Sequence, residues 1–262
     1  MKKLFLIKQY FIYLWKAKSA HGVHSPFVFQ FINEVLKDTR HYYFFEEIQK
    51  LRNEMYADKT LLNIEDFGAG SHLNNFKQRA VNDIARTAGR NEKLGKLLFR
   101  MVNQYKPQCI LELGTSMGLG TSYLATANTM AQVHTIEGGK EIAAQAKKHF
   151  AKLGIQNIIQ HVGNFDEVLI PILQQLASID LLFVDGNHRK IPTLNYFENA
   201  KPFLHQHSIV IFDDIHWSAE MHEAWQIIKN DEKVSLSIDL FYFGIVFFQS
   251  DFKEKQHFVL KM

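Results

Sequence analysis

The sequence predicts an α/β fold with a doubly wound, mostly parallel sheet of seven strands that ends in an antiparallel hairpin. One observation is a regular alternation of short apolar runs and helical stretches from residue 106 onward. A second is a pair of β-like runs, 234–240 and 242–249, whose short connection fits an antiparallel pairing. Residues 1–105 are mostly helical in pattern, so we expect an N-terminal helical region followed by a domain at 106–262.

Apolar runs of strand length make up the parallel part of the predicted sheet. They lie at 109–113, 132–136, 157–162, 180–184 and 208–212. Short buried strands that alternate with helices are typical of a parallel sheet covered on both faces. An intervening helix is expected at 140–153, where Ile142, Ala146 and Phe150 share one face and Gly154 ends the helix.

The region before residue 106 contains apolar segments of helical periodicity. They lie at 27–36, 42–55, 76–84 and 94–102. Between them, residues 66–71 form a glycine-rich segment that imitates a cofactor turn, but polar residues follow it and no strand ending in an acid comes after. We interpret residues 66–71 either as a loop that covers an active site or as a tight turn.

Composition excludes several classes of protein. The chain has 262 residues, of which 47% are hydrophobic and 22% charged, and its net charge of +3 is too small to indicate nucleic-acid binding. The single cysteine, Cys109, lies within an apolar run, which excludes an internal disulfide and a zinc cluster and fits a reducing, cytoplasmic setting.

The first residues are both apolar and basic. Residues 4–15 are apolar with Lys8 in the middle, are too short to span a bilayer and lack a signal-peptide cleavage pattern. One interpretation is an amphipathic helix in residues 1–18 that contacts a membrane surface or a second subunit in a homo-oligomer. The other is a helix that packs on its own domain.

The most informative segment is residues 110–120, Ile-Leu-Glu-Leu-Gly-Thr-Ser-Met-Gly-Leu-Gly. An apolar run that stops at Gly114 and passes into helix-forming sequence lets a ligand approach bare backbone N–H groups. Glu137 ends the next apolar run, where its carboxylate can accept hydrogen bonds from a ribose diol. Together these features predict a nucleoside-binding site.

The spacing of the glycines indicates which nucleoside is bound. A dinucleotide fingerprint has the pattern Gly-x-Gly-x-x-Gly, which this turn lacks, and Glu112 precedes the turn. A carboxylate there repels a pyrophosphate and favours the cationic amino-acid end of S-adenosylmethionine. The segment resembles motif I of the class I methyltransferases. This resemblance implies a Rossmann-like domain that binds S-adenosylmethionine through Glu112, Gly114, Thr115, Ser116, Gly118, Gly120, Glu137 and Gly138.

A second loop extends the predicted cofactor site. Gly163, Asn164 and Phe165 follow the third apolar run, where the resembling family places the loop beside the adenine. There Asn164 would supply a polar contact and Phe165 a flat apolar wall. The alternative is that Asn164 or Asp166 simply caps the following helix.

Three aspartates follow the fourth and fifth apolar runs, namely Asp185, Asp213 and Asp214. Carboxylates gathered at one rim of a sheet need a cation, a bound proton or a basic partner. Oxygen ligands favour Mg²⁺, Mn²⁺ or Ca²⁺ over zinc. We therefore expect these three residues to bind a divalent metal, with a metal-free site as the alternative.

The aspartates extend the resemblance to catechol-type, cation-dependent O-methyltransferases and their sugar-modifying relatives. It covers roughly residues 105–250. In these families Asp185 would contact both cofactor and metal, and His188 of the Asp-Gly-x-His run would be the catalytic base. Asp214 departs from the catechol pattern, which has Asp-Asn. His216 is the competing base, or it belongs to an ordinary helix entry before Trp217.

The predicted activity is methyl transfer from S-adenosylmethionine to a hydroxyl of a small-molecule acceptor, with Asp185 and His188 as catalytic residues. Two alternatives remain from the sequence: an NAD(P)-dependent oxidoreductase, and a non-catalytic protein that binds S-adenosylmethionine. The acceptor could be a catechol, a sugar hydroxyl, another oxygen nucleophile or an amine. We expect no nucleic-acid partner.

Overall fold

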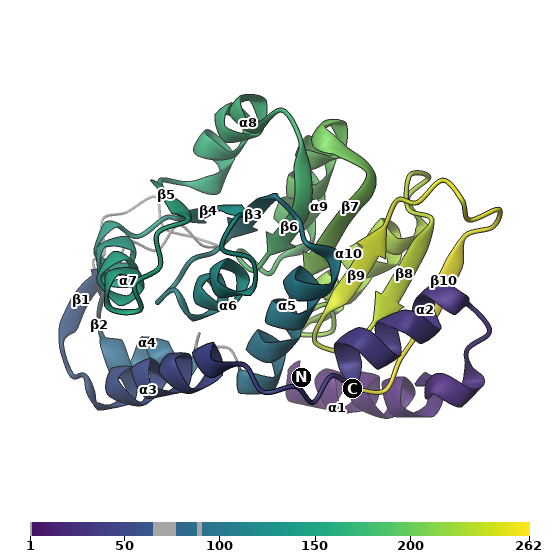
Figure 1. Ribbon diagram of the computed structural model, residues 1–262, viewed down its shortest axis with the longest axis horizontal. Helices are drawn as coiled ribbons and strands as arrows, with labels where there is room; N and C mark the ends of the chain where they lie inside the picture. Colours follow the sequence, from purple (N-terminus) through teal and green to yellow (C-terminus); the bar gives the residue numbers. More distant parts are fainter. Residues whose placement is uncertain (1, 65–76, 88–90) are drawn as a thin grey trace. The chain divides into compact units, whose positions relative to one another are not determined.

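The computed structural model describes residues 2–64, 77–87 and 91–262 (Figure 1). The predicted α/β class is confirmed, with one strand more than expected: eight strands form a mixed sheet in the order β10-β8-β9-β7-β6-β3-β4-β5. The chain divides into two compact units, one formed by residues 34–169 and the other by residues 1–33 and 170–262. The predicted boundary at residue 106 stays a prediction.

The unit of residues 34–169 contains three parallel strands, β3 (Cys109–Leu113), β4 (Gln132–Glu137) and β5 (Ile158–Val162). Helices α6 (Leu119–Ala127) and α7 (Lys140–Lys152) follow β3 and β4. Four of the five residues of β3 are buried, as expected of a strand covered on both faces. Helix α7 ends as predicted, with Gly154 in the left-handed region at φ 66°.

The same unit begins with the helical region. Helices α3 (Tyr43–Ala57) and α5 (Glu92–Tyr105) agree with the predicted segments, and the side chain of Asn91 caps α5 by accepting from Lys93 N at 3.0 Å. The predicted helix at 76–84 was wrong in its first half. There β2 (Lys77–Ala80) pairs with β1 (Leu61–Ile64), and α4 (Val81–Thr87) starts only afterwards. The predicted loop at 66–71 lies outside the described residues.

The other unit contains β6 (Ile179–Val184), β7 (Leu204–Phe212), β8 (Leu236–Asp239), β9 (Gly244–Phe247) and β10 (Gln256–Val259). Strands β6 and β7 are parallel, and β8 and β9 form the predicted antiparallel pair. The eighth strand is β10, which lies parallel to β8. Helix α8 (Phe165–Leu176) begins in the last residues of the first unit and continues into this one. Helices α9 (Lys190–Ala200) and α10 (Ala219–Asn230) complete the alternation, and η3 (Lys201–Phe203) precedes β7.

The first residues of the chain belong to this second unit. They form α1 (Lys2–Lys16), the single turn η1 (Ala20–Gly22), α2 (Pro26–Phe31) and the π-helical segment η2 (Ile32–Leu36), which continues into residues of the other unit. Among the described residues, none of the helices is both long and apolar enough to cross a bilayer.

Candidate functional site

The turn after β3 has the backbone geometry that the sequence predicts. Gly114 has φ 108° and Gly118 has φ 81°, conformations that residues with a Cβ rarely adopt. A Cβ on Gly118 would lie 2.5 Å from the ring of Phe150 in α7. Gly118 is therefore required for the turn to pack closely against α7, and the positive φ of Gly114 likewise favours glycine.

Glu137 lies at the tip of β4 and is hydrogen-bonded to this turn. Its Oε2 accepts from the backbone N–H of Ser116 at 2.8 Å, and its Oε1 accepts from the backbone N–H of Gly139 at 3.0 Å. Burial raises the pKa of the Glu137 carboxyl, and the N–H donors, including that of Gly138, oppose this rise. The prediction that Glu137 and the glycine turn form one site is thus supported by direct contact.

Glu112 is almost fully buried in β3. Its Oε2 accepts from the hydroxyls of Thr121 and Thr135, the latter at 2.6 Å. The hydroxyls of Thr115 and Thr135 lie 2.6 Å apart, so this network also holds the first residue after Gly114. Sequence reasoning assigned Glu112 and Thr115 to the cofactor and did not foresee the roles of Thr121 and Thr135, which belong to no recognised motif.

The remaining predicted cofactor residues lie at helix starts. Gly120 is in the first turn of α6, and Gly163 and Asn164 precede Phe165, the first residue of α8. Oδ1 of Asn164 accepts from Asp166 N at 3.2 Å, so Asn164 acts as a cap. The alternative role of Asn164, capping of the following helix, is therefore observed. An adenine contact by Asn164 and Phe165 stays a prediction.

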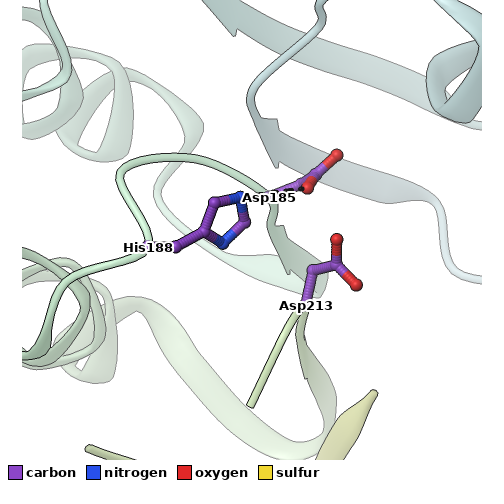
Figure 2. Close-up of side chains that lie close together, drawn as sticks. All are labelled: Asp185, His188 and Asp213. Carbon is purple, nitrogen blue, oxygen red and sulfur yellow. Dashed lines mark ion pairs between the residues drawn. The ribbon is translucent and has the colours of Figure 1, made fainter. Parts of the chain in front are cut away.

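Asp185, His188 and Asp213 come together in the unit of residues 1–33 and 170–262, as Figure 2 shows. One ligand atom from each lies within 4.8 Å of the others, and His188 Nε2 is 3.9 Å from Asp185 Oδ1. Asp185 follows β6 and Asp213 follows β7, and Asp213 N donates to Val184 O at 3.0 Å, so the pairing of the two strands continues up to the cluster. Two carboxylates and one imidazole fit a divalent cation.

The group that the structure assembles differs from the predicted metal set in one member. His188 joins Asp185 and Asp213, whereas Asp214 is not part of the group found among the described residues. Asp214 has φ 55°, so the chain turns sharply immediately after Asp213. Metal binding by Asp214 stays a prediction that this grouping does not support.

The loop that carries His188 is held in place by hydrogen bonds of its neighbour Asn187. Asn187 has φ 52°, its Nδ2 donates to the hydroxyl of the buried Tyr196 at 3.0 Å, and its Oδ1 accepts from Arg189 Nε at 2.7 Å. These contacts fix the backbone on both sides of His188. Sequence reasoning missed the role of Asn187, which a Gly-Asn pair in a short loop could have indicated.

His216 is engaged elsewhere. It is 5% exposed, its Nε2 lies 2.8 Å from Asp239 Oδ2, and its Nδ1 lies 3.0 Å from His222 Nδ1. Ser218 caps α10 by accepting from Met221 N, as the helix-entry interpretation expects. These contacts favour a structural role for His216 and leave His188 as the histidine beside the aspartates.

A separate cavity of about 640 Å³ lies in the unit of residues 1–33 and 170–262. Its lining includes Lys18, His24, Phe27, Phe252 and Phe258. Sequence reasoning did not find it, because it is assembled from two short segments that are far apart along the chain and contain no recognised motif.

Comparisons with known proteins show similarity to methyltransferases. Residues 111–215 match the family model of a methyltransferase domain. A probable O-methyltransferase of Mycobacterium tuberculosis is 26% identical over 132 residues, which are 47% of this chain and 56% of that protein. An uncharacterized protein of Acanthamoeba polyphaga mimivirus is 33% identical over 92 residues, which are 32% of this chain and 42% of that protein. The chain thus spans about half the length of these curated relatives.

Solved structures share the fold. The O-methyltransferase TomG of Streptomyces achromogenes, in complex with S-adenosylmethionine, is 23% identical with a TM-score of 0.53, covering 62% of this chain and 82% of its own. A Bacillus cereus O-methyltransferase in complex with S-adenosylhomocysteine is 17% identical with a TM-score of 0.55, covering 83% and 96%. Residues 111–215 thus match a methyltransferase domain, and the chain shares the fold of these solved O-methyltransferases.

Proposed function

We propose that this protein transfers the methyl group of S-adenosylmethionine to a hydroxyl of a small molecule. The observation that carries the proposal is the hydrogen bond between Ser116 N and Glu137 Oε2, because it joins the glycine turn to the acid that would hold a ribose. The names of the relatives support an oxygen acceptor, since both the mycobacterial protein and TomG are called O-methyltransferases.

Each part of the turn has a distinct role in this proposal. Gly114 and Gly118 allow close approach of the cofactor to the backbone, and Glu137 accepts hydrogen bonds from the ribose hydroxyls. The negative charge of Glu112 favours the ammonium end of the cofactor, and Thr121 and Thr135 hold that carboxylate in place. S-adenosylmethionine supplies an electrophilic methyl group on a sulfonium.

Asp185, His188 and Asp213 would handle the acceptor. Asp185 and Asp213 would hold a divalent cation such as Mg²⁺, which lowers the pKa of a hydroxyl bound to it. His188 would either share in holding the cation or accept the hydroxyl proton, a role that histidine side chains commonly fill in catalysis. Because the cluster contains a histidine beside two aspartates, we favour His188 as the base over His216.

Several wider expectations accompany this proposal. Residues 1–105 would help to select the acceptor, and the single cysteine suits work in a reducing cytoplasm. A small molecule is the expected partner rather than nucleic acid, because the net charge is only +3. Self-association would be tested by sedimentation of the purified protein.

The test has two stages. First, S-adenosylmethionine should raise the melting temperature of the protein and NAD should not, because a ligand specific for the folded state stabilises it by mass action. Second, labelled S-adenosylmethionine is incubated with a panel of catechols, sugars and amines, with Mg²⁺ or with EDTA. Transfer to hydroxyl compounds supports the proposal. Stabilisation by NAD alone, or cofactor binding without transfer to any acceptor, would overturn it in favour of an oxidoreductase or a binding protein.

A further inference from the structure

We propose that helix α1 docks the protein on an anionic membrane surface. The helix is 15 residues long and carries on one side a row of large apolar side chains that face solvent. We call this row the apolar stripe, and its members are Leu4 (73% exposed), Ile7 (53%), Phe11 (66%), Leu14 (43%) and Trp15 (85%). Leu4, Ile7, Phe11 and Leu14 follow one another at intervals of three or four residues, and Trp15 lies four residues after Phe11, so all five lie on a single face of the helix.

The opposite face of α1 is fixed to its own unit. Gln9 and Tyr13 are buried, and the hydroxyl of Tyr13 donates to Leu260 O at 2.7 Å. Tyr10 and Tyr13 both pack against the ring of Phe241. One face of the helix is therefore packed against the rest of its unit, and the apolar stripe remains exposed to solvent. The packed face agrees with the interpretation of residues 1–18 as a helix that packs on its own domain, whereas contact with a membrane surface or a second subunit stays a prediction.

The positive charge around the apolar stripe indicates that its binding partner is anionic. Residues 1–33 contain five lysines and no aspartate or glutamate. Lys3, Lys8 and Lys18 are exposed in the structure. Lys8 follows Leu4 by four residues and so belongs to the same side as the stripe. A surface that combines large apolar side chains with exposed lysines is complementary to anionic lipid headgroups above acyl chains.

A second copy of the chain fits the same face less well. In a symmetric dimer formed through α1, the lysines of the two copies would face each other. Residues 1–33 contain no acid that could offset this repulsion. Trp15, at 85% exposed, is also the residue type that favours the boundary between headgroups and acyl chains. The helix is too short to span the bilayer, so it would lie along the surface.

The experiment measures co-flotation of the full chain with vesicles, without any need for activity. We expect binding to vesicles of phosphatidylcholine mixed with phosphatidylglycerol, at least tenfold weaker binding to pure phosphatidylcholine, and a loss of binding as salt is raised. Emission of Trp15 should shift to the blue on binding. A Trp217→Phe background removes the other exposed tryptophan, while Trp225 is buried.

Two pairs of variants test whether binding depends specifically on the apolar stripe and its lysines or on nonspecific adsorption to lipid. Phe11→Ser with Trp15→Ser should reduce binding at least tenfold, whereas Tyr43→Ser with Met130→Ser removes comparably exposed apolar side chains elsewhere and should not. Lys3→Glu with Lys8→Glu should abolish the preference for anionic vesicles. The matched control is Lys147→Glu with Lys148→Glu, two exposed lysines of α7.

Three outcomes would overturn the docking proposal. One is no flotation with anionic vesicles at low salt, and another is flotation that the stripe variants leave unchanged. The third is sedimentation as a dimer that Phe11→Ser with Trp15→Ser converts to a monomer, because the stripe would then be a subunit interface. Variants that fail to fold are recognised by their melting temperature, in which case the milder Trp15→Gln is used. Methyl transfer is measured separately, so its absence would not bear on docking.

Discussion

The backbone N–H of Ser116 donates a hydrogen bond to Glu137 Oε2, with an N···O distance of 2.8 Å, so the turn after β3 is held against the tip of β4. Ser116 has φ 47°, and the hydrogen bond to Glu137 helps to hold this less common conformation. The residue that would bind the ribose thus also shapes the turn that would approach the cofactor. Loss of the carboxylate should affect both parts of the site.

The affinity for S-adenosylmethionine should fall with decreasing pH because Glu137 must be ionised to accept hydrogen bonds from two ribose hydroxyls. Burial raises the Glu137 pKa, so the fall should begin above the ordinary glutamate value of about 4.3. Without cofactor the linkage has the opposite sign: the raised pKa favours folding at low pH, and this contribution is lost as pH rises through the folded-state pKa.

Calorimetric titration between pH 5 and pH 8 would measure this dependence. Glu137→Gln should weaken binding by about tenfold or more at pH 8, since each 1.4 kcal/mol is tenfold and charged hydrogen bonds contribute about 1.5–3 kcal/mol. The variant should also flatten the pH dependence. Glu47→Gln, an exposed position of α3, serves as the control. An unchanged affinity in Glu137→Gln would remove Glu137 from the site.

Two glycines with positive φ should differ in their tolerance of alanine. Gly154 has φ 66° and open space around its Cβ position, so Gly154→Ala should cost about 1 kcal/mol for the left-handed backbone alone. Gly118 has φ 81°, and its added Cβ would meet the ring of Phe150 at 2.5 Å, so Gly118→Ala should cost about 2–4 kcal/mol.

Urea denaturation of both variants gives the free energies of unfolding for this comparison. Equal losses at Gly118 and Gly154 would show that the ring of Phe150 moves aside without cost. Cofactor affinity should fall only in Gly118→Ala, because that residue immediately precedes α6 and belongs to the proposed cofactor turn.

The sequence was sufficient for the parts of this fold that depend on local patterning. The apolar runs from β3 to β7 and the glycines around Gly118 are local signals, and each was predicted within a few residues. The pair β1 and β2 was not, because Lys77–Ala80 is too polar and short to be distinguished from the start of α4. Strand β10 lies beyond the expected terminal hairpin and is recognised only through its pairing with β8.

The site was predicted as far as strand ends determine it. Asp185 and Asp213 come together because β6 and β7 are adjacent and parallel, which alternating patterning already implies. His188, and not Asp214, joins these two aspartates in the cluster. This outcome depends on the backbone of two turns, with φ 52° at Asn187 and φ 55° at Asp214. Such angles follow from tertiary contacts, here the bond from Asn187 to Tyr196.

The threonines around Glu112 give a third prediction. Thr135→Val preserves shape but removes a hydroxyl that donates to Glu112 Oε2 and lies 2.6 Å from the hydroxyl of Thr115. Because a hydrogen bond to a buried charge is lost, the variant should lose about 1.5–3 kcal/mol of stability. Thr193→Val is the matched control, since the hydroxyl of this buried threonine has only a weak 3.5 Å contact with Met221 Sδ.

Thermal and urea denaturation of the two valine variants would compare these costs. S-adenosylmethionine should also bind more weakly to Thr135→Val, because Glu112 loses part of its support. A loss in Thr193→Val as large as that in Thr135→Val would mean that the cost comes from packing rather than from the carboxylate.

Divalent cation binding should depend on Asp213. Asp213→Asn removes a charge from a cluster of two carboxylates and one imidazole, so the affinity for Mn²⁺, measured by titration with paramagnetic relaxation, should fall at least tenfold. Asp83→Asn, an exposed acid of α4, should leave it unchanged. Activity that persists in EDTA, together with absent Mn²⁺ binding to the native protein, would show that the aspartates position the acceptor without a metal.

The proposed proton acceptor provides the last prediction. His188→Gln keeps a polar side chain but cannot take a proton at neutral pH, so kcat should fall by about 10²–10⁴ while the affinity for S-adenosylmethionine stays within twofold. The rise of kcat/KM on the acidic side of the pH profile should disappear, because it reports ionisation of the base. His207→Gln, at an exposed position of β7, should keep the native profile. If His188→Gln lost only cation affinity and kept the acidic limb at saturating Mg²⁺, His188 would be a metal ligand and the proton would leave by another route.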